Sequence, residues 1–248
     1  MRRQSHGPRP DRSIASAALN HLASKAARTH LPTSGGSTDP LQPQPDPHLA
    51  SARALLREHT HDAHQRLHRL TVFRALLAGT LEREGYGRLL TRLHDYYRGV
   101  DARLLSACRR LALRGEDYAY QPRAAMFAAD LVTLGFACTP AGADLPPTIE
   151  TPAALAGALY VIEGSLLGGA THDDAARRLL PASHAADTQG RSYWAWCRQV
   201  ASERWQSTTS FIERLAHTPN MAHAAIAAAH ATFTSMHLCL ESLHEPSC

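Results

Sequence analysis

The chain has 248 residues, 44% of them apolar and 19% charged, with a formal net charge of +4. This length and composition suffice for one soluble domain with a well-filled core. Nearly all of the excess positive charge lies in the first thirty residues, and a nearly neutral body argues against nucleic acid as the main partner. The five widely spaced cysteines form no C-x-x-C pair, which predicts reduced thiols and a cytoplasmic protein.

Residues 1–48 differ in composition from the rest of the chain. They hold seven of the fifteen prolines, a Gly-Gly-Ser run and few large apolar residues, so they cannot bury enough surface to offset the entropy of ordering. We therefore predict a disordered N-terminal extension over 1–48 and a folded domain over 49–248. A secretory signal is excluded because no continuous apolar segment follows the basic start, whereas a transit peptide stays open as an alternative.

From residue 49 onward the pattern predicts an all-α domain. Leu, Ala and Arg recur at helical spacing, and no segment alternates with the period of a strand. We expect helices over 49–69, 71–79, 83–114, 121–135, 151–180, 188–217 and 220–244, the fifth interrupted between Gly164 and Gly169. The longest apolar stretch, 153–170, contains Glu163 and four glycines, which favours a buried helix over a membrane span.

The first predicted helix carries a histidine beside its apolar stripe. Leu56, Thr60, Ala63 and Leu67 recur at steps of three and four residues, and His64 lies at the edge of that stripe. An imidazole at such an edge can reach a ligand held between this helix and a neighbour. The alternative is a core-edge histidine that bonds a backbone carbonyl.

Two arginines share the direction of His64. Arg53 and Arg57 precede it by eleven and seven residues, which returns each to within about 20° of it at 100° per residue. An imidazole with two guanidiniums suits a planar ligand that has a central metal and carboxylates at its rim. The alternatives are solvated arginines, or a zinc site formed by His64 with His61 and His68.

Glycines interrupt the fifth predicted helix. Gly164, Gly168 and Gly169 fall within six positions of an apolar run, and each interior glycine costs about 1 kcal/mol relative to alanine. Close approach of the backbone to a flat ligand is one reason to accept that cost. Tight packing between helices is the other.

The two segments together resemble the haem oxygenase family. L-R-E-H-T-H-D-A-H is followed about a hundred residues later by Y-V-I-E-G-S-L-L-G-G, which is similar to the bacterial branch with its distal E-G-S-x-L-G. The likeness extends over about 50–244. It includes Tyr86, Tyr97 and Asp101 on the second long helix, and T-F-T-S-M-H-L-C-L near the end.

The resemblance implies a multi-helix bundle that holds haem between a proximal and a distal helix. His64 then takes the role of proximal ligand to the haem iron, and Arg57 is directed towards a haem propionate. The other site residues that the resemblance implies are Gly164, Ser165, Gly168 and Gly169 on the distal side and Arg53 and Tyr97 as further haem-binding residues.

The implied activity is oxidative ring opening of haem to biliverdin with release of iron and carbon monoxide. Haem is then both substrate and cofactor, and dioxygen is consumed. Electrons must come from an external reductase, a ferredoxin or flavoprotein, because the chain has no G-x-G-x-x-G fingerprint and no cysteine set for an iron–sulfur cluster. A phytochrome that accepts biliverdin is a further expected partner.

Two positions depart from the family pattern. His68 stands where relatives often have a carboxylate, and an imidazole is a weaker acceptor for the ligand's N–H. Ala170 replaces a polar residue that many relatives carry after the two glycines. These departures keep a second hypothesis open, a non-catalytic haem carrier or sensor on the same fold. A third, a thiamin-degrading enzyme of this fold, would need a cysteine nucleophile.

Overall fold

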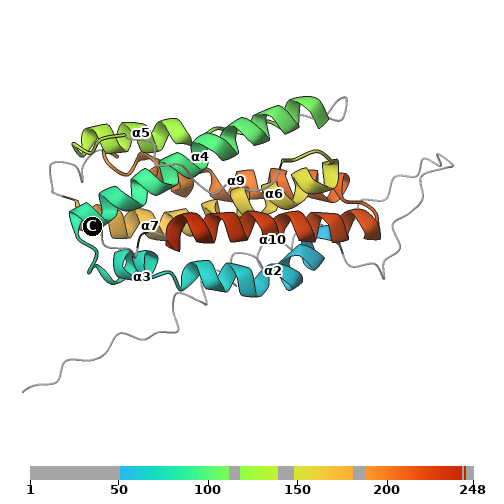
Figure 1. The fold of residues 1–248 in the computed structure, drawn as a ribbon, viewed down its shortest axis with the longest axis horizontal. Helices are drawn as coiled ribbons and strands as arrows, with labels where there is room; N and C mark the ends of the chain where they lie inside the picture. Colours follow the sequence, from blue (N-terminus) through green and yellow to red (C-terminus); the bar gives the residue numbers. More distant parts are fainter. Residues whose placement is uncertain (1–50, 112–117, 139–147, 181–187, 242, 244–248) are drawn as a thin grey trace, which may run out of the picture. The chain divides into compact units, whose positions relative to one another are not determined.

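The computed structural model describes residues 51–111, 118–138, 148–180, 188–241 and 243. Within these ranges all regular structure is helical, which confirms the predicted all-α class. The helices, labelled as in Figure 1, are α2 (Ala52–His68), α3 (Thr71–Ala78), α4 (Arg83–Leu111), α5 (Ala124–Thr133), α6 (Pro152–Gly164), α7 (Leu166–Leu179), α9 (Ser192–Leu215) and α10 (Pro219–Glu241). The extension expected over 1–48 lies outside the described residues.

Local sequence signals set several helix ends. The Ser51 side chain accepts a hydrogen bond from the Ala54 N–H at 3.2 Å and caps α2. Thr151 caps α6 in the same way through the N–H of Ala154 at 3.1 Å, ahead of a proline in the first turn. Gly79 ends α3 with a φ of 72°, a conformation that glycine adopts without steric cost.

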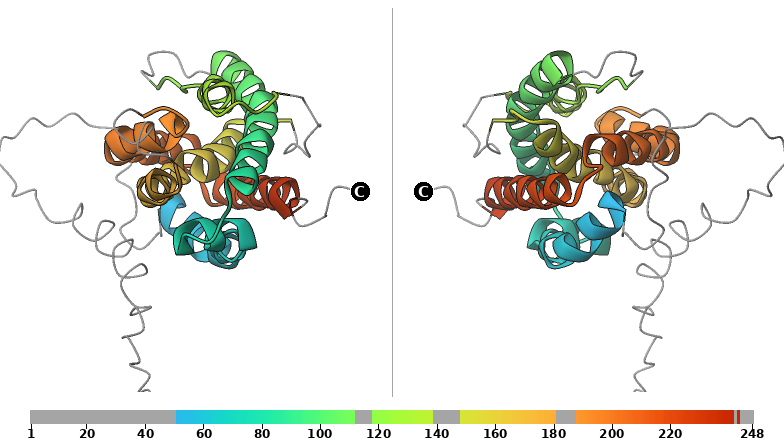
Figure 2. Two further views of the ribbon diagram at one scale, coloured as in Figure 1. Left: turned by 90° about the vertical axis from the view of Figure 1, so that its left-hand side faces the viewer. Right: turned by 90° about the vertical axis from the view of Figure 1, so that its right-hand side faces the viewer.

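Helix α6 lies at the centre of the described bundle. It packs against α10 and α9 and also contacts α2, α4 and α7 (Figure 2). Its backbone approaches α10 so closely at Gly157 that a Cβ there would lie 2.1 Å from the Ala225 carbonyl oxygen. Leu155, Leu159 and Ile162 are fully buried on this helix.

The segment Pro152–Leu179, which spans α6 and α7, is long and apolar enough by length and composition to cross a membrane. In the bundle, 61% of its apolar window is buried against other parts of the protein. That burial is typical of a core helix, as the sequence predicted for this stretch.

Candidate functional site

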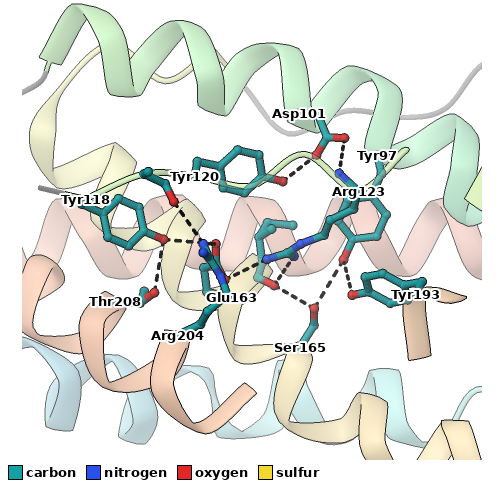
Figure 3. Close-up of polar contacts among 12 residues, drawn as sticks. Tyr97, Asp101, Tyr118, Tyr120, Arg123, Glu163, Ser165, Tyr193, Arg204 and Thr208 are labelled. Atoms are coloured by element: carbon teal, nitrogen blue, oxygen red, sulfur yellow. Dashed lines mark hydrogen bonds and ion pairs between the residues drawn. The ribbon is translucent and has the colours of Figure 1, made fainter. Parts of the chain in front are cut away.

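The predicted interruption of the fifth helix is a turn at a single residue. Helix α6 ends at Gly164, Ser165 forms the turn, and α7 begins at Leu166. The Ser165 hydroxyl donates to the Ile162 carbonyl oxygen at 2.8 Å, and the Tyr97 hydroxyl lies 3.3 Å from the same Oγ (Figure 3). Ser165 and the buried Tyr97 thus connect the break to α4.

The three glycines around this break have different surroundings. A Cβ on Gly168 would meet only the His172 Cε1 atom, at 3.9 Å. A Cβ on Gly164 would lie 3.4 Å from the Trp205 ring, an ordinary contact. A Cβ on Gly169 would lie 2.4 Å from the Cβ of Cys197 on α9, so Gly169 serves the packing of α7 on α9. Its expected place on the distal side stays a prediction.

His64 on α2 is neutral at physiological pH. Although its residue reaches the surface, partial burial, followed by the neighbouring His68 and His61, lowers the pKa of His64 to about 4. Its Nε2 lies 3.0 Å from the Nε2 of His68, and its ring meets Phe233 of α10 edge-on. A neutral imidazole nitrogen has the lone pair that a metal requires.

Arg53 and Arg57 gather at the contact between α2 and α6. Burial raises the pKa of Tyr160, while a hydrogen bond with Thr60 and the positive charges of Arg57 and Arg53 lower it, so both guanidiniums act on that hydroxyl. Tyr160 also meets Trp205 of α9, with ring centroids 5.7 Å apart. This end of the site therefore offers positive charge and a phenol hydroxyl to carboxylates.

The other end of the site is lined by aromatic rings. The His172 ring on α7 stacks on Phe73 of α3 at 4.9 Å between centroids and lies 5.1 Å from Trp194 of α9. Burial, followed by the charge of His68, lowers the pKa of His172 to about 4. Its Nδ1 is buried without a hydrogen-bond partner.

These two ends bracket His64 and the glycines. On α2, Thr60 precedes His64 by four residues and His68 follows it by four. On α6 and α7, Tyr160 precedes Gly164 by four residues and His172 follows Gly168 by four. Thr60 bonds Tyr160 and His68 interacts with His172. Helix α2 also contacts α6, so the two segments lie near one another, and the placement of His64 opposite the glycine pair stays a prediction.

Comparisons with known proteins agree on one family. A family model described as "Heme oxygenase" matches residues 50–242. A protein of Xanthomonas campestris pv. campestris (strain 8004) named "Heme oxygenase" is 30% identical over 182 residues, which cover 71% of this chain and all of that protein.

The chain belongs to the haem oxygenase family.

The fold agrees with this membership. A solved haem oxygenase structure from Leptospira interrogans matches with a TM-score of 0.64 at 19% identity, covering 78% of this chain and all of that one. The resemblance stated from the two sequence motifs is therefore confirmed. The individual site residues stay predictions, since these likenesses concern the chain as a whole.

The residues of the site fit haem, the substrate that the family name implies. A neutral His64 would supply a ring nitrogen to the iron, and Gly168 leaves space on the segment after the helix break. Arg53 and Arg57 supply charges for propionates. The histidine that replaces the usual carboxylate, His68, contacts His64 directly and has its own pKa lowered by burial.

The structure weighs against two alternative chemistries. Among the described residues no three histidine, cysteine or acidic side chains are placed to hold a metal ion, which argues against the alternative of a zinc site formed by His61, His64 and His68. Burial raises the pKa of Cys197 to about 12 and of Cys108 to about 11. These two thiols are protonated at neutral pH and are poor nucleophiles.

Sequence reasoning missed Tyr160, His172 and Trp205. Each occurs inside an amphipathic or apolar helix, where the sequence pattern predicts that a large side chain belongs to the hydrophobic core. Tyr160 and His172 had one usable signal in the sequence. Tyr160 lies four residues before Gly164 and His172 four residues after Gly168, so each shares a helix face with its glycine. Trp205 offered none, because its helix carries no motif of the family.

Proposed function

We propose that the protein opens haem oxidatively to biliverdin, with release of iron and carbon monoxide. Membership of the haem oxygenase family makes it an oxidoreductase enzyme. The observation that carries the proposal is a helix break with open space at Gly168, next to a helix, α2, whose His64 is a neutral histidine. Bound haem supplies the reactivity towards dioxygen, and the protein supplies ligation, orientation and shape.

On the proximal side, His64 would hold the haem iron through a ring nitrogen. Its low pKa keeps the lone pair available throughout the neutral range. His68 shares one hydrogen bond with the Nε2 of His64, whose direction depends on the tautomer of each ring, and the iron would take the ring nitrogen of His64 that this bond leaves free. A neutral imidazole at this position gives the ligand less anionic character than a carboxylate partner would.

At the rim, Arg53, Arg57 and Tyr160 orient the substrate by binding its carboxylates. Forked guanidinium donors pair well with carboxylates and so restrict rotation of a flat ring in its own plane. On the distal side, the absence of side chains at Gly164 and Gly168 lets the backbone approach the ring. Ser165 and Tyr97 then offer hydroxyls beside that surface.

Electrons are proposed to come from a separate ferredoxin or flavoprotein reductase. The sequence contains neither a dinucleotide fingerprint nor a cysteine set for an iron–sulfur cluster. We propose a cytoplasmic location from the cysteine pattern, and a biliverdin-accepting phytochrome as a partner downstream.

Turnover of added haemin tests the proposal. Purified protein loaded with haemin should give a Soret spectrum of histidine-ligated haem, and reductant with oxygen should convert it to biliverdin in one equivalent per haem. Intact haem after many reduction cycles would instead support the non-catalytic carrier or sensor, which the departures at His68 and Ala170 motivate.

A further inference from the structure

A buried charge cluster lies behind the helix break and has no part in the function described so far. Its centre is an ion pair between Arg123, which precedes α5, and Glu163, the last residue before Gly164, at 2.9 Å between Nη2 and Oε2. Both side chains have no solvent exposure. Figure 3 shows the pair between α4 above and the break below.

The Arg123 side chain also binds the backbone at the end of α6. Its Nη1 donates to the Ile162 carbonyl oxygen at 2.6 Å, the same oxygen that accepts the Ser165 hydroxyl at 2.8 Å. Arg123 is itself fixed, because Asp101 of α4 accepts its backbone N–H at 2.7 Å and the Tyr120 hydroxyl at 2.6 Å. The position of Ser165 is therefore tied through Arg123 to α4.

Glu163 is held from the opposite side by α9. Arg204 donates twice to its carboxylate, at 2.7 and 3.1 Å, and the Tyr118 hydroxyl donates at 3.1 Å. Burial alone would raise the pKa of Glu163, but the charges of Arg123 and Arg204 and these hydrogen bonds lower it below its usual value. The carboxylate is therefore ionised within the core.

Burial of such charges is a poor way to gain stability. Desolvation offsets most of the attraction, and well-packed apolar residues of similar volume commonly replace a buried ion pair without loss of stability. The pair instead contributes geometric specificity, because its charge-assisted hydrogen bonds are satisfied in only one arrangement of the chain. Here the chain so fixed is the turn between the two distal glycines.

We propose that Arg123 and Glu163 are positioning residues for ring opening, which hold Ser165 and Gly164 in register with the haem face. The inference rests on the proposed function, because only that function places a reacting haem beside the helix break. Neither side chain is proposed to touch the substrate. Arg123 lies over the Tyr97 ring at 5.5 Å from its centroid, and both charged residues act through the backbone of residues 162–165. A displacement near 1 Å at a reacting centre can lower the rate about a hundredfold.

The test is a double variant, Arg123→Met with Glu163→Leu, which removes both charges and keeps the volume. Its haem-free form should unfold at a temperature at or below that of the wild type, because the half-buried Arg204 loses its carboxylate partner. With haem, kcat should fall about tenfold while KM changes by less than about twofold, since binding groups are intact. The biliverdin isomer ratio and the pH at which the ferric Soret band shifts should both change.

A purely structural role gives a different result. It predicts that the folded double variant, whatever its unfolding temperature, has the wild-type kcat, isomer ratio and Soret pH midpoint, and that outcome would overturn the proposal. If the double variant does not fold, Arg204→Gln can be used instead, because Arg204 is the half-buried member of the same cluster. It should change kcat, the isomer ratio and the Soret pH midpoint in the same direction as the double variant, by smaller amounts. Unchanged readouts in a folded Arg204→Gln would equally overturn it.

A control separates position from stability. Leu131→Ala on α5 removes a fully buried hydrocarbon side chain and should lower the unfolding temperature without changing the isomer ratio or the Soret midpoint. Failure of the proposed function is also distinguishable. If the wild type binds haem and makes no biliverdin, the Soret midpoint of the variants still reports whether the pair positions the break.

Discussion

Adjacent glycines in α7 should respond in opposite ways to the same substitution. A methyl at Gly168 would contact only the His172 ring edge at 3.9 Å, so Gly168→Ala should stabilise the haem-free protein by up to about 1 kcal/mol through helix propensity. A methyl at Gly169 would lie 2.4 Å from the Cys197 Cβ, so Gly169→Ala should destabilise it by about 1–3 kcal/mol through overpacking.

Activity should follow the reverse order per folded molecule. The open space beside Gly168 is the space proposed for the haem face, so Gly168→Ala should lower the biliverdin formed per haem consumed. Gly169→Ala should keep that yield in the fraction that folds. Urea unfolding of the haem-free variants, paired with product quantification, checks both. A stabilised Gly168→Ala variant with full biliverdin yield would refute the distal role of Gly168.

Three further predictions concern the remaining polar residues. His64→Ala should abolish axial ligation and turnover while the helical circular dichroism stays unchanged, and a normal Soret band would contradict it. Arg57→Glu should weaken haem binding by about 1–3 kcal/mol and alter the isomer ratio, whereas an unaltered affinity would make Arg57 a solvated flank residue. His172 has a folded pKa of about 4 against 6.5, so the unfolded chain binds more protons and stability should fall by up to about 3 kcal/mol as pH drops from 6.5 to 4. His172→Phe should remove that part of the loss, and acid unfolding followed by circular dichroism measures it.

The helices and the shared face of the candidate haem-binding residues could be predicted because their signals are local. Periodicity along the chain identifies a helix, and the spacing of Arg53, Arg57 and His64 places them on one face without knowledge of any neighbour. The break between Gly164 and Gly169 was predictable for the same reason, since clustered glycines are costly within a helix.

The roles of individual glycines could not be predicted, because they depend on what faces each one. Gly168 and Gly169 are neighbours in sequence but point about 100° apart on the helix, and only the packed α9 shows that one of them meets Cys197.

Glu163 was visible in the sequence as a charge within an apolar run. Its partner Arg123 lies forty residues earlier, and no periodic signal connects the two. Long-range pairs of this kind become apparent only when α5, α6 and α9 are packed together.

The most direct test of the central claim is single-turnover oxidation of the protein–haem complex under a defined supply of electrons. Purified protein loaded with one haem should, with reductant and dioxygen, lose its Soret band and yield one biliverdin, one iron and one carbon monoxide per haem. The same complex of His64→Ala should yield none. Recovery of intact haem from the wild type after repeated reduction and reoxygenation would contradict the assignment of a ring-opening enzyme.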